Sequence, residues 1–168
     1  MVIKMPLSEK GVDDAIKQLK AAKSRIKEAQ KQIVERLGAY GALRASLYFS
    51  VATKNPDDVI PTITVSINRS TMVATIRASS EDVGFIEFGA GSRFAGTAHP
   101  LNGQFGTGPG TYPDGKGNWD NPHGWFYTAS DGTKRHSYGQ PAGMAMYQAS
   151  LDIQAEAERI VKEVLQSL

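Results

Sequence analysis

The residues of this chain best suited to acid–base or metal chemistry are its histidines and a group of aspartates near them. They are His99, His123 and His136, with Asp114, Asp120 and Asp131. Imidazole nitrogens and carboxylate oxygens bind zinc and transfer protons in enzymes. No two of these histidines have the His-x3-His spacing that places both on one face of a helix, and all three stand in irregular segments. The spacing therefore predicts neither a metal site nor a catalytic centre.

Two further motifs fall short of catalytic patterns. Residues 110–116, Gly-Thr-Tyr-Pro-Asp-Gly-Lys, match half of a phosphate-binding loop, but Gly117 stands where a serine or threonine would follow, and no strand leads in. Ser137 lacks the flanking glycines of a nucleophile elbow. The chain contains no cysteine, which excludes a thiol nucleophile and a disulfide. We therefore expect no enzymatic activity and no bound cofactor.

A long glycine- and aromatic-rich segment, residues 89–140, dominates the second half of the chain. It is too rich in glycine for a core and too aromatic for a plain linker. Such a composition is typical of a loop that becomes ordered against another protein chain. We expect an assembly loop here, and the candidate subunit-interface residues are Glu87, Phe88, Trp119, Trp125, Phe126 and Tyr127. The alternative is that these aromatic side chains fold back over their own sheet.

Glu87 stands at the entrance to this segment, inside the apolar sequence Phe-Ile-Glu-Phe. A lone carboxylate is expensive to bury unless it is paired. We expect it to pair with an arginine such as Arg44 or Arg77, within the chain or across a subunit boundary; the alternative is an exposed glutamate. Gly89 and Gly91 are expected to let the chain turn sharply, because glycine adopts positive φ without penalty.

Length and composition indicate a single domain over residues 1–168. No window is apolar enough to span a membrane, and the first residues do not resemble a secretory signal, so synthesis in the cytoplasm is expected. The net charge of +2 is uneven, because residues 1–44 are basic and the remainder is acidic. Five of the ten basic residues in this part are Lys17, Lys20, Lys23, Lys27 and Lys31. They indicate a solvated helix face, or weak and sequence-independent contact with DNA or an acidic partner.

The first expected element is a helix over residues 8–37, with Ser8 as its N-cap and Gly38 as its stop. Its apolar residues recur at intervals of three and four. They include Ala15, Ala22 and Ala29, each seven residues apart, and Leu19, Ile26 and Ile33 in the same period. Because this pattern ends after about four repeats, we expect packing within the chain rather than a coiled coil.

The remaining elements complete an α+β domain. Residues 40–52 read as a short helical or extended link, and residues 59–88 as an antiparallel β-meander whose third strand is 85–88. A second long helix is expected over residues 141–166, with Pro141 in its first turn. The expected fold is a small antiparallel sheet packed by a long N-terminal and a long C-terminal helix, with the glycine- and aromatic-rich loop between them.

Five motifs in this order resemble the neck and tail-completion proteins of siphophages, also described as minor capsid or tail-component proteins. The motifs are Gly-Ala-Leu-Arg-Ala-Ser at 41–46, Phe-Ile-Glu-Phe-Gly-Ala at 85–90, His-Pro at 99–100, Gly-Trp-Phe-Tyr at 124–127, and the helix entry at 140–149. The chain departs from the family pattern at residues 38–41, where Gly-Ala-Tyr-Gly replaces a proline-x-threonine-glycine, and in its longer loop.

The resemblance implies a structural virion protein of a tailed phage or prophage. It would form a homo-oligomeric ring at the head–tail joint, contact other neck and tail proteins, let DNA pass through its lumen, and have no chemistry of its own. It would be made in the host cytoplasm and incorporated in the virion. The alternatives are a carbohydrate-binding module that uses the loop aromatics and, with less support, a tail-associated hydrolase.

Overall fold

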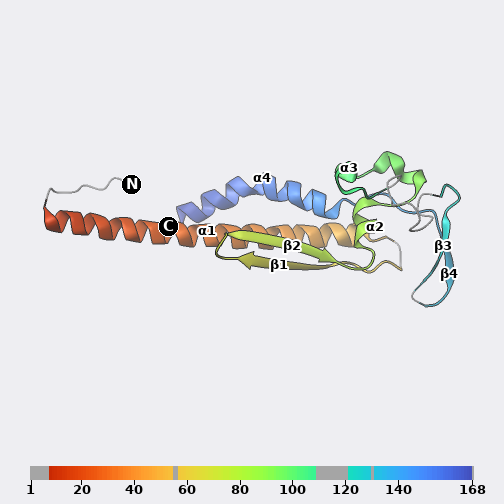
Figure 1. Ribbon diagram of the computed structural model, residues 1–168, viewed down its shortest axis with the longest axis horizontal. Helices are drawn as coiled ribbons and strands as arrows, with labels where there is room; N and C mark the ends of the chain where they lie inside the picture. Colours follow the sequence, from red (N-terminus) through yellow and green to blue (C-terminus); the bar gives the residue numbers. More distant parts are fainter. Residues whose placement is uncertain (1–7, 55–56, 109–120, 130, 168) are drawn as a thin grey trace.

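The computed structural model describes residues 8–54, 57–108, 121–129 and 131–167, and has an elongated α+β fold (Figure 1). The elements in chain order are α1 (Glu9–Ala52), β1 (Thr62–Asn68), β2 (Val73–Ser79), α2 (Val83–Phe88), a 3-10 helix (Ser92–Thr97), α3 (Asn102–Phe105), β3 (Trp125–Thr128), β4 (Lys134–Ser137) and α4 (Ala145–Gln166). Within the described ranges, no helix has the length and apolar character needed to cross a membrane.

Helix α1 is much longer than expected. Ser8 caps it as predicted, and its hydroxyl accepts a hydrogen bond from the Gly11 N–H at 3.2 Å. Gly38 does not stop the helix, so that prediction is wrong, and the expected link at 40–52 is the continuation of α1. The reason is tertiary packing. A Cβ on Gly41 would lie 2.4 Å from Ile153 Cδ1 of α4 and 2.5 Å from Ile76 Cδ1 of β2, so glycine allows three elements to converge.

The first half of α1 projects beyond the rest of the molecule (Figure 1). Its apolar residues Val12, Leu19 and Ile26 are 42%, 57% and 57% exposed. The expectation that this face packs within the chain is therefore wrong for these three residues, although Ala15 and Ala29 of the same face are buried. Only the second half of α1 lies between α4 and the β1–β2 hairpin.

The β-structure consists of two separate antiparallel hairpins, β1–β2 and β3–β4. Ile63 and Ile67 of β1 alternate with exposed polar residues as predicted, and Val65 packs against Gly38 of α1. The third strand predicted at 85–88 is wrong, because these residues form the helix α2. The periodicity of such a short apolar run does not distinguish a strand from a helix. Ile86 belongs to the core with Phe49 and Ala145.

Helix α4 begins at Ala145 rather than Pro141, after Met144 in the left-handed region with φ 53°. The residues before it have a different role. Gln140 pairs with Ala90 in a two-way backbone bridge, and the N–H of Gly143 donates to Ile86 O at 2.8 Å. The segment entering α4 is therefore fastened to α2 and to the residues that follow it.

Arg44 of α1 ties the two long helices together through Asp152 of α4. Its Nε donates to Asp152 Oδ2 at 2.5 Å, and the Tyr48 hydroxyl donates to the same oxygen at 2.8 Å. Both hydrogen bonds lower the pKa of Asp152 below its ordinary value of 3.8, and the one from Arg44 contributes more than the one from Tyr48.

This carboxylate should make the fold sensitive to acid. Because the pKa of Asp152 is lower in the folded chain, the pair stabilises the fold above the unfolded pKa and loses this contribution as the pH falls through the folded value. We expect Asp152→Asn to lower Tm at about pH 7 and to reduce the further loss of Tm toward about pH 3. Thermal melts at several pH values check this, with the exposed Glu81→Gln as control. Parallel pH profiles of Asp152→Asn and wild type would contradict it.

Candidate assembly surface

Glu87 is the centre of a buried polar cluster at the start of α4. Its Oε2 accepts the backbone N–H of Met146 at 2.8 Å, and its Oε1 accepts that of Tyr147 at 3.0 Å. Oε1 also lies 3.2 Å from Nε2 of His99, and both side chains are almost inaccessible. The carboxylate therefore caps α4 from a different element, at the end of the helix where the macrodipole favours negative charge.

The tautomer of His99 follows from its second hydrogen bond. Its Nδ1 accepts the backbone N–H of Leu101 at 3.0 Å, so in the neutral ring Nε2 carries the proton and donates to Glu87. The ring centroid of Phe88 lies 4.5 Å from that of His99, and the ring centroid of Tyr147 lies 5.3 Å from it. Imidazole and carboxylate are thus enclosed by aromatic rings and satisfied by backbone groups, as in a structural cluster.

Glu87 is paired, but the expected arginine partner is wrong. Arg44 binds Asp152, and Glu87 binds His99 and the first N–H groups of α4. Little in the sequence indicates these partners, because His99 and the start of α4 lie twelve and almost sixty residues from Glu87. The one available signal was a histidine beside a proline in the segment that follows the apolar Phe-Ile-Glu-Phe sequence.

Next to this cluster, two segments cross at very close range. Ala90 and Gln140 exchange two backbone hydrogen bonds of 2.9 Å. Gly89, Gly91 and Gly139 have φ values of +77°, +89° and +90°. The predicted positive φ at Gly89 and Gly91 is confirmed, although the chain leaves a helix there and not a strand. A Cβ on Gly139 would lie 2.0 Å from Ala90 O, so this crossing depends on glycine.

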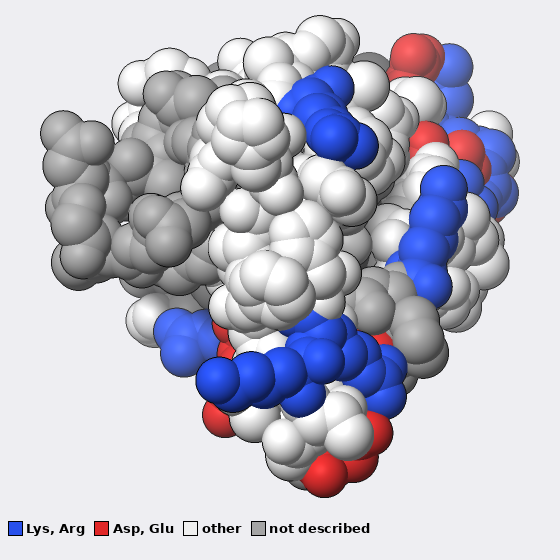
Figure 2. All heavy atoms as spheres, turned by 90° about the vertical axis from the view of Figure 1, so that its right-hand side faces the viewer, with Lys and Arg blue, Asp and Glu red and all other residues white. Residues whose placement is uncertain are grey.

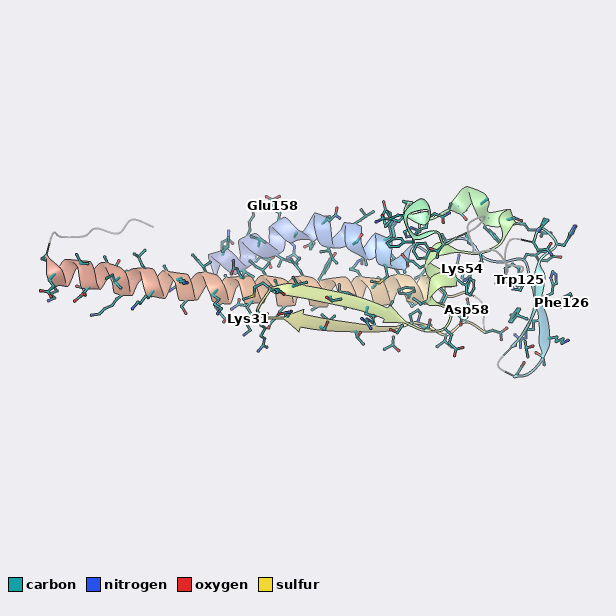
Figure 3. All side chains as sticks on the ribbon, in the orientation of Figure 1. Lys31, Lys54, Asp58, Trp125, Phe126 and Glu158 are labelled. Atoms are coloured by element: carbon teal, nitrogen blue, oxygen red, sulfur yellow. The ribbon has the colours of Figure 1, made fainter. Side chains whose placement is uncertain are left out.

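The β3–β4 hairpin carries three of the candidate interface aromatics. Phe126 is 75% exposed, and Figure 3 shows it at the far end of the molecule. Trp125 and Tyr127 lie on the opposite face of β3 and are half-buried. The Tyr127 hydroxyl donates to Asp57 Oδ2 at 2.7 Å, and Arg135 of β4 binds the same carboxylate. Tyr127 thus anchors the hairpin to its own chain, and Trp119 lies outside the described residues.

Between this hairpin, α2 and the end of α1 is a cavity of about 890 Å³. Its aromatic lining includes Tyr48, Phe85, Phe94, Trp125 and Tyr138. Arg93 stacks over the Tyr138 ring at 3.8 Å from the centroid. Lys54, Asp58 and Asp82 bring charge of both signs to its edge. Aromatic faces with a few polar groups are typical of a surface that receives another molecule.

Large apolar side chains are also exposed on the second half of α1, which leads toward this end of the molecule (Figure 1). Leu43, Leu47 and Val51 recur every four residues on α1 and are 68%, 48% and 65% exposed. Val59 and Ile60 follow, before β1. Figure 2 looks onto this end and shows a central area of uncharged surface with Lys and Arg side chains beside it. Together with Phe126, we call these six residues the hairpin-end residues. Sequence reasoning missed the three on α1 because the segment at 40–52 was not recognised as part of one helix, and it missed Val59 and Ile60 because they were assigned to the β-meander.

The other motifs considered from the sequence do not converge. Within the part of the chain that the structure describes, no three His, Cys, Asp or Glu side chains are placed to hold a metal ion. His99 is buried at the start of α4, and the His136 ring packs between Phe126 and Tyr138. The phosphate-loop-like residues 110–116, together with Asp114 and Asp120, lie outside the described residues.

The described geometry therefore offers an aromatic end to the molecule, with an uncharged area beside charged side chains (Figure 2), and a separate projecting helix at the other end. Comparisons of the chain with protein-family models, with curated proteins and with solved structures found no match.

Proposed function

We propose that this chain is a structural virion protein of a tailed phage or prophage, which forms a homo-oligomeric ring at the head–tail joint. In this role it acts as a neck or tail-completion protein, and DNA passes through the ring. The observation that carries the proposal is the set of large apolar side chains exposed at the hairpin end. The ordered motifs at 41–46, 85–90 and 140–149 supply the resemblance to this class of protein.

Exposed apolar side chains in this number favour burial by another protein chain. Leu43, Val51 and Phe126 are each more than 60% exposed to solvent. Apolar side chains exposed together in this way often mark a protein–protein interaction site. Aromatic and aliphatic residues with little charge between them are typical of the centre of an interface. A ring requires that this surface meets a different surface of the next subunit, so that each copy has two unlike contacts.

The buried Glu87 cluster and the Ala90–Gln140 crossing support this role by positioning the contact surface. Glu87 joins α2 to the start of α4, and the Ala90–Gln140 bridge joins the segment after α2 to the residues that follow the β3–β4 hairpin. A surface that is rigid before binding loses less entropy on assembly. We expect the partners to be further copies of the chain and other neck and tail proteins. DNA would be touched weakly and without sequence preference, through the lysines of α1.

Removing one hairpin-end side chain should weaken the ring and leave the subunit folded. Leu43→Gln and Phe126→Gln each replace an exposed apolar contact, so we expect closed particles to disappear from negative-stain images while Tm stays within about 2 °C of wild type. Val73→Gln is the matched control, because Val73 is 50% exposed on the solvent face of the β1–β2 hairpin. Closed particles that still form in both Leu43→Gln and Phe126→Gln would contradict the proposal.

The aromatic cavity favours carbohydrate binding as a second candidate function. Tryptophan and tyrosine rings beside aspartates are what sugar rings stack on and hydrogen-bond to, and Trp125, Tyr138 and Asp82 line the cavity together. Saturable binding of soluble glycans that disappears with Trp125→Ala would favour this function over assembly.

A further inference from the structure

The first half of α1 gathers basic side chains on one of its sides. We call this side the lysine face, and it consists of Lys17, Lys20, Lys27 and Lys31. The intervals of three, seven and four residues between them return an α-helix to the same side. Between Ala15 and Lys27 the sequence has five basic residues and no acidic one. The lysine face is therefore a stretch of positive charge on the part of α1 that projects from the molecule.

The lysine face lies on the side of α1 that the β1–β2 hairpin covers farther along the helix. Gly38 faces this hairpin, since a Cβ there would lie 3.1 Å from a side chain of β2. Three of the four lysines stand 7, 11 and 18 residues before Gly38, which is close to two, three and five helical turns. Figure 3 shows Lys31 beside the turn of the hairpin, whereas Glu158 of α4 lies on the opposite side of α1. Helix α4 therefore does not cover the lysine face.

The turn between β1 and β2 borders the lysine face at its C-terminal end. Arg69 stands in this turn with a largely exposed side chain, and its Nη2 lies 3.6 Å from Glu35 Oε1 of α1. In Figure 1 the hairpin ends beside the middle of α1, and beyond it no described helix or strand lies along this side of α1. The lysine face and the β1–β2 turn thus form an open corner with basic side chains on both of its sides.

The central lysines of this face have no acidic partner. Lys17 and Lys31, at its two ends, pair with carboxylates one turn away at ammonium–carboxylate distances of 3.8 and 3.5 Å. Lys20 and Lys27, at its centre, are exposed and form no ion pair with a carboxylate of the described residues. Exposed ion pairs within one helix contribute little, so those at the ends compete weakly with a bound anion. An anionic ligand is therefore attracted most strongly to the centre of the face.

The residue types of the lysine face favour the phosphates of a nucleic-acid duplex as this ligand. Lysine binds phosphate as a point charge, and a row of lysines neutralises phosphates without reading the sequence. Residues 8–39 contain no aromatic side chain on which the bases of a single strand could stack. The face also contains no arginine or asparagine to bind the edges of bases. These features favour contact with the backbone of a duplex.

We propose that the lysine face and the β1–β2 turn bind the phosphate backbone of double-stranded DNA, weakly and without sequence preference. The proposal deepens the proposed function and rests on it for the identity of the nucleic acid, because it names the surface of the subunit that meets the DNA. The contact belongs to the single subunit, so it does not require the ring to close. In a closed ring, several copies of the face would bind one duplex and raise the apparent affinity.

Fluorescence anisotropy with a labelled duplex of about 20 base pairs tests the contact on a single subunit. The chain for this test carries Leu43→Gln, which we expect not to form rings. With four lysines at the DNA, the logarithm of its binding constant should fall with the logarithm of the salt concentration with a slope of about −3 to −4. Adding Lys20→Gln and Lys27→Gln keeps good helix formers at both positions. This double change should bring the slope about two units closer to zero and weaken binding tenfold or more at about 0.1 M salt.

The matched control removes the same charge elsewhere. Lys134→Gln with Lys162→Gln takes one lysine from β4 and one from the exposed surface of α4, so we expect the salt slope to stay unchanged. Equal loss of binding in the two double variants, or a duplex that does not bind at about 50 mM salt, would overturn the proposal. If the wild-type chain forms closed particles but binds no duplex, only the lysine contact is refuted. If the duplex binds and no closed particle forms, only the ring is refuted.

Competition distinguishes duplex DNA from other polyanions. Unlabelled duplex should displace the labelled duplex at a lower charge concentration than a single strand of the same length or polyglutamate, because its phosphates are packed more densely. A single strand that competes as well as the duplex would contradict a contact with the duplex backbone. Polyglutamate that competes equally well would indicate an acidic protein as the partner and would overturn the assignment to DNA.

Discussion

Replacing Gly139 by alanine is expected to lower the free energy of unfolding by about 3 kcal/mol or more. The new Cβ would lie 2.0 Å from Ala90 O and 2.5 Å from Ala90 C, both of which are backbone atoms that cannot rotate away. The φ of Gly139 is also +90°, which an alanine adopts only with strain. The two segments would have to separate, and the paired backbone hydrogen bonds between Ala90 and Gln140 would be lost. Urea denaturation measures the effect.

Gly96→Ala is the matched control for this change. Gly96 belongs to the same glycine-rich region, a Cβ there would meet nothing within 4 Å, and its φ is not positive. We expect its unfolding free energy to stay within about 0.5 kcal/mol of wild type. Equal stability of Gly139→Ala and Gly96→Ala would show that the crossing at Ala90 is not part of the folded state in solution.

Replacing Glu87 by glutamine is expected to destabilise the protein by about 2–4 kcal/mol. The carboxylate receives three donors, the backbone N–H groups of Met146 and Tyr147 and the Nε2 of His99. A glutamine side chain offers one oxygen and turns an NH2 group toward at least one of these donors. That leaves buried N–H groups unsatisfied and removes the negative charge from the start of α4. Chemical denaturation monitored by circular dichroism measures the loss.

The control for this substitution is Glu158→Gln on the exposed side of α4, where the side chain is 79% exposed and projects away from α1 (Figure 3). We expect a change within about 0.5 kcal/mol there. Should Glu87→Gln prove as stable as Glu158→Gln, the buried cluster would have no structural role.

The long elements of the fold could be predicted from sequence, but the C-terminal end of α1 and the start of α4 could not. The α+β class and the two long helices followed from apolar periodicity, and Ser8 was recognised as a cap. Gly38 was misread because a glycine after an apolar stripe is typical of a helix end. Here a Cβ at Gly38 would lie 3.1 Å from Ala74 Cβ and 3.2 Å from Val65 Cγ1, so glycine allows the β1–β2 hairpin to approach α1 closely. Those two residues lie 36 and 27 positions away in the sequence, so a local pattern does not reveal the reason.

The candidate site was predictable only where the information was local. Positive φ at Gly89 and Gly91 follows from residue type, and the need of Glu87 for a partner follows from its apolar neighbours. The identity of that partner depends on how α2, the loop at His99 and the start of α4 meet, which is a long-range property. Likewise, the length of α1 determines that Leu43, Leu47 and Val51 share one face, and this length was underestimated.

The measurement that tests assembly most directly is the mass distribution of the purified chain across a wide concentration range, with negative-stain images of the same samples. The account predicts closed, multi-subunit particles at high concentration that Leu43→Gln and Phe126→Gln abolish and Val73→Gln does not. A chain that forms no closed particle at any concentration, and whose mass is the same in Leu43→Gln as in wild type, would contradict the proposed ring.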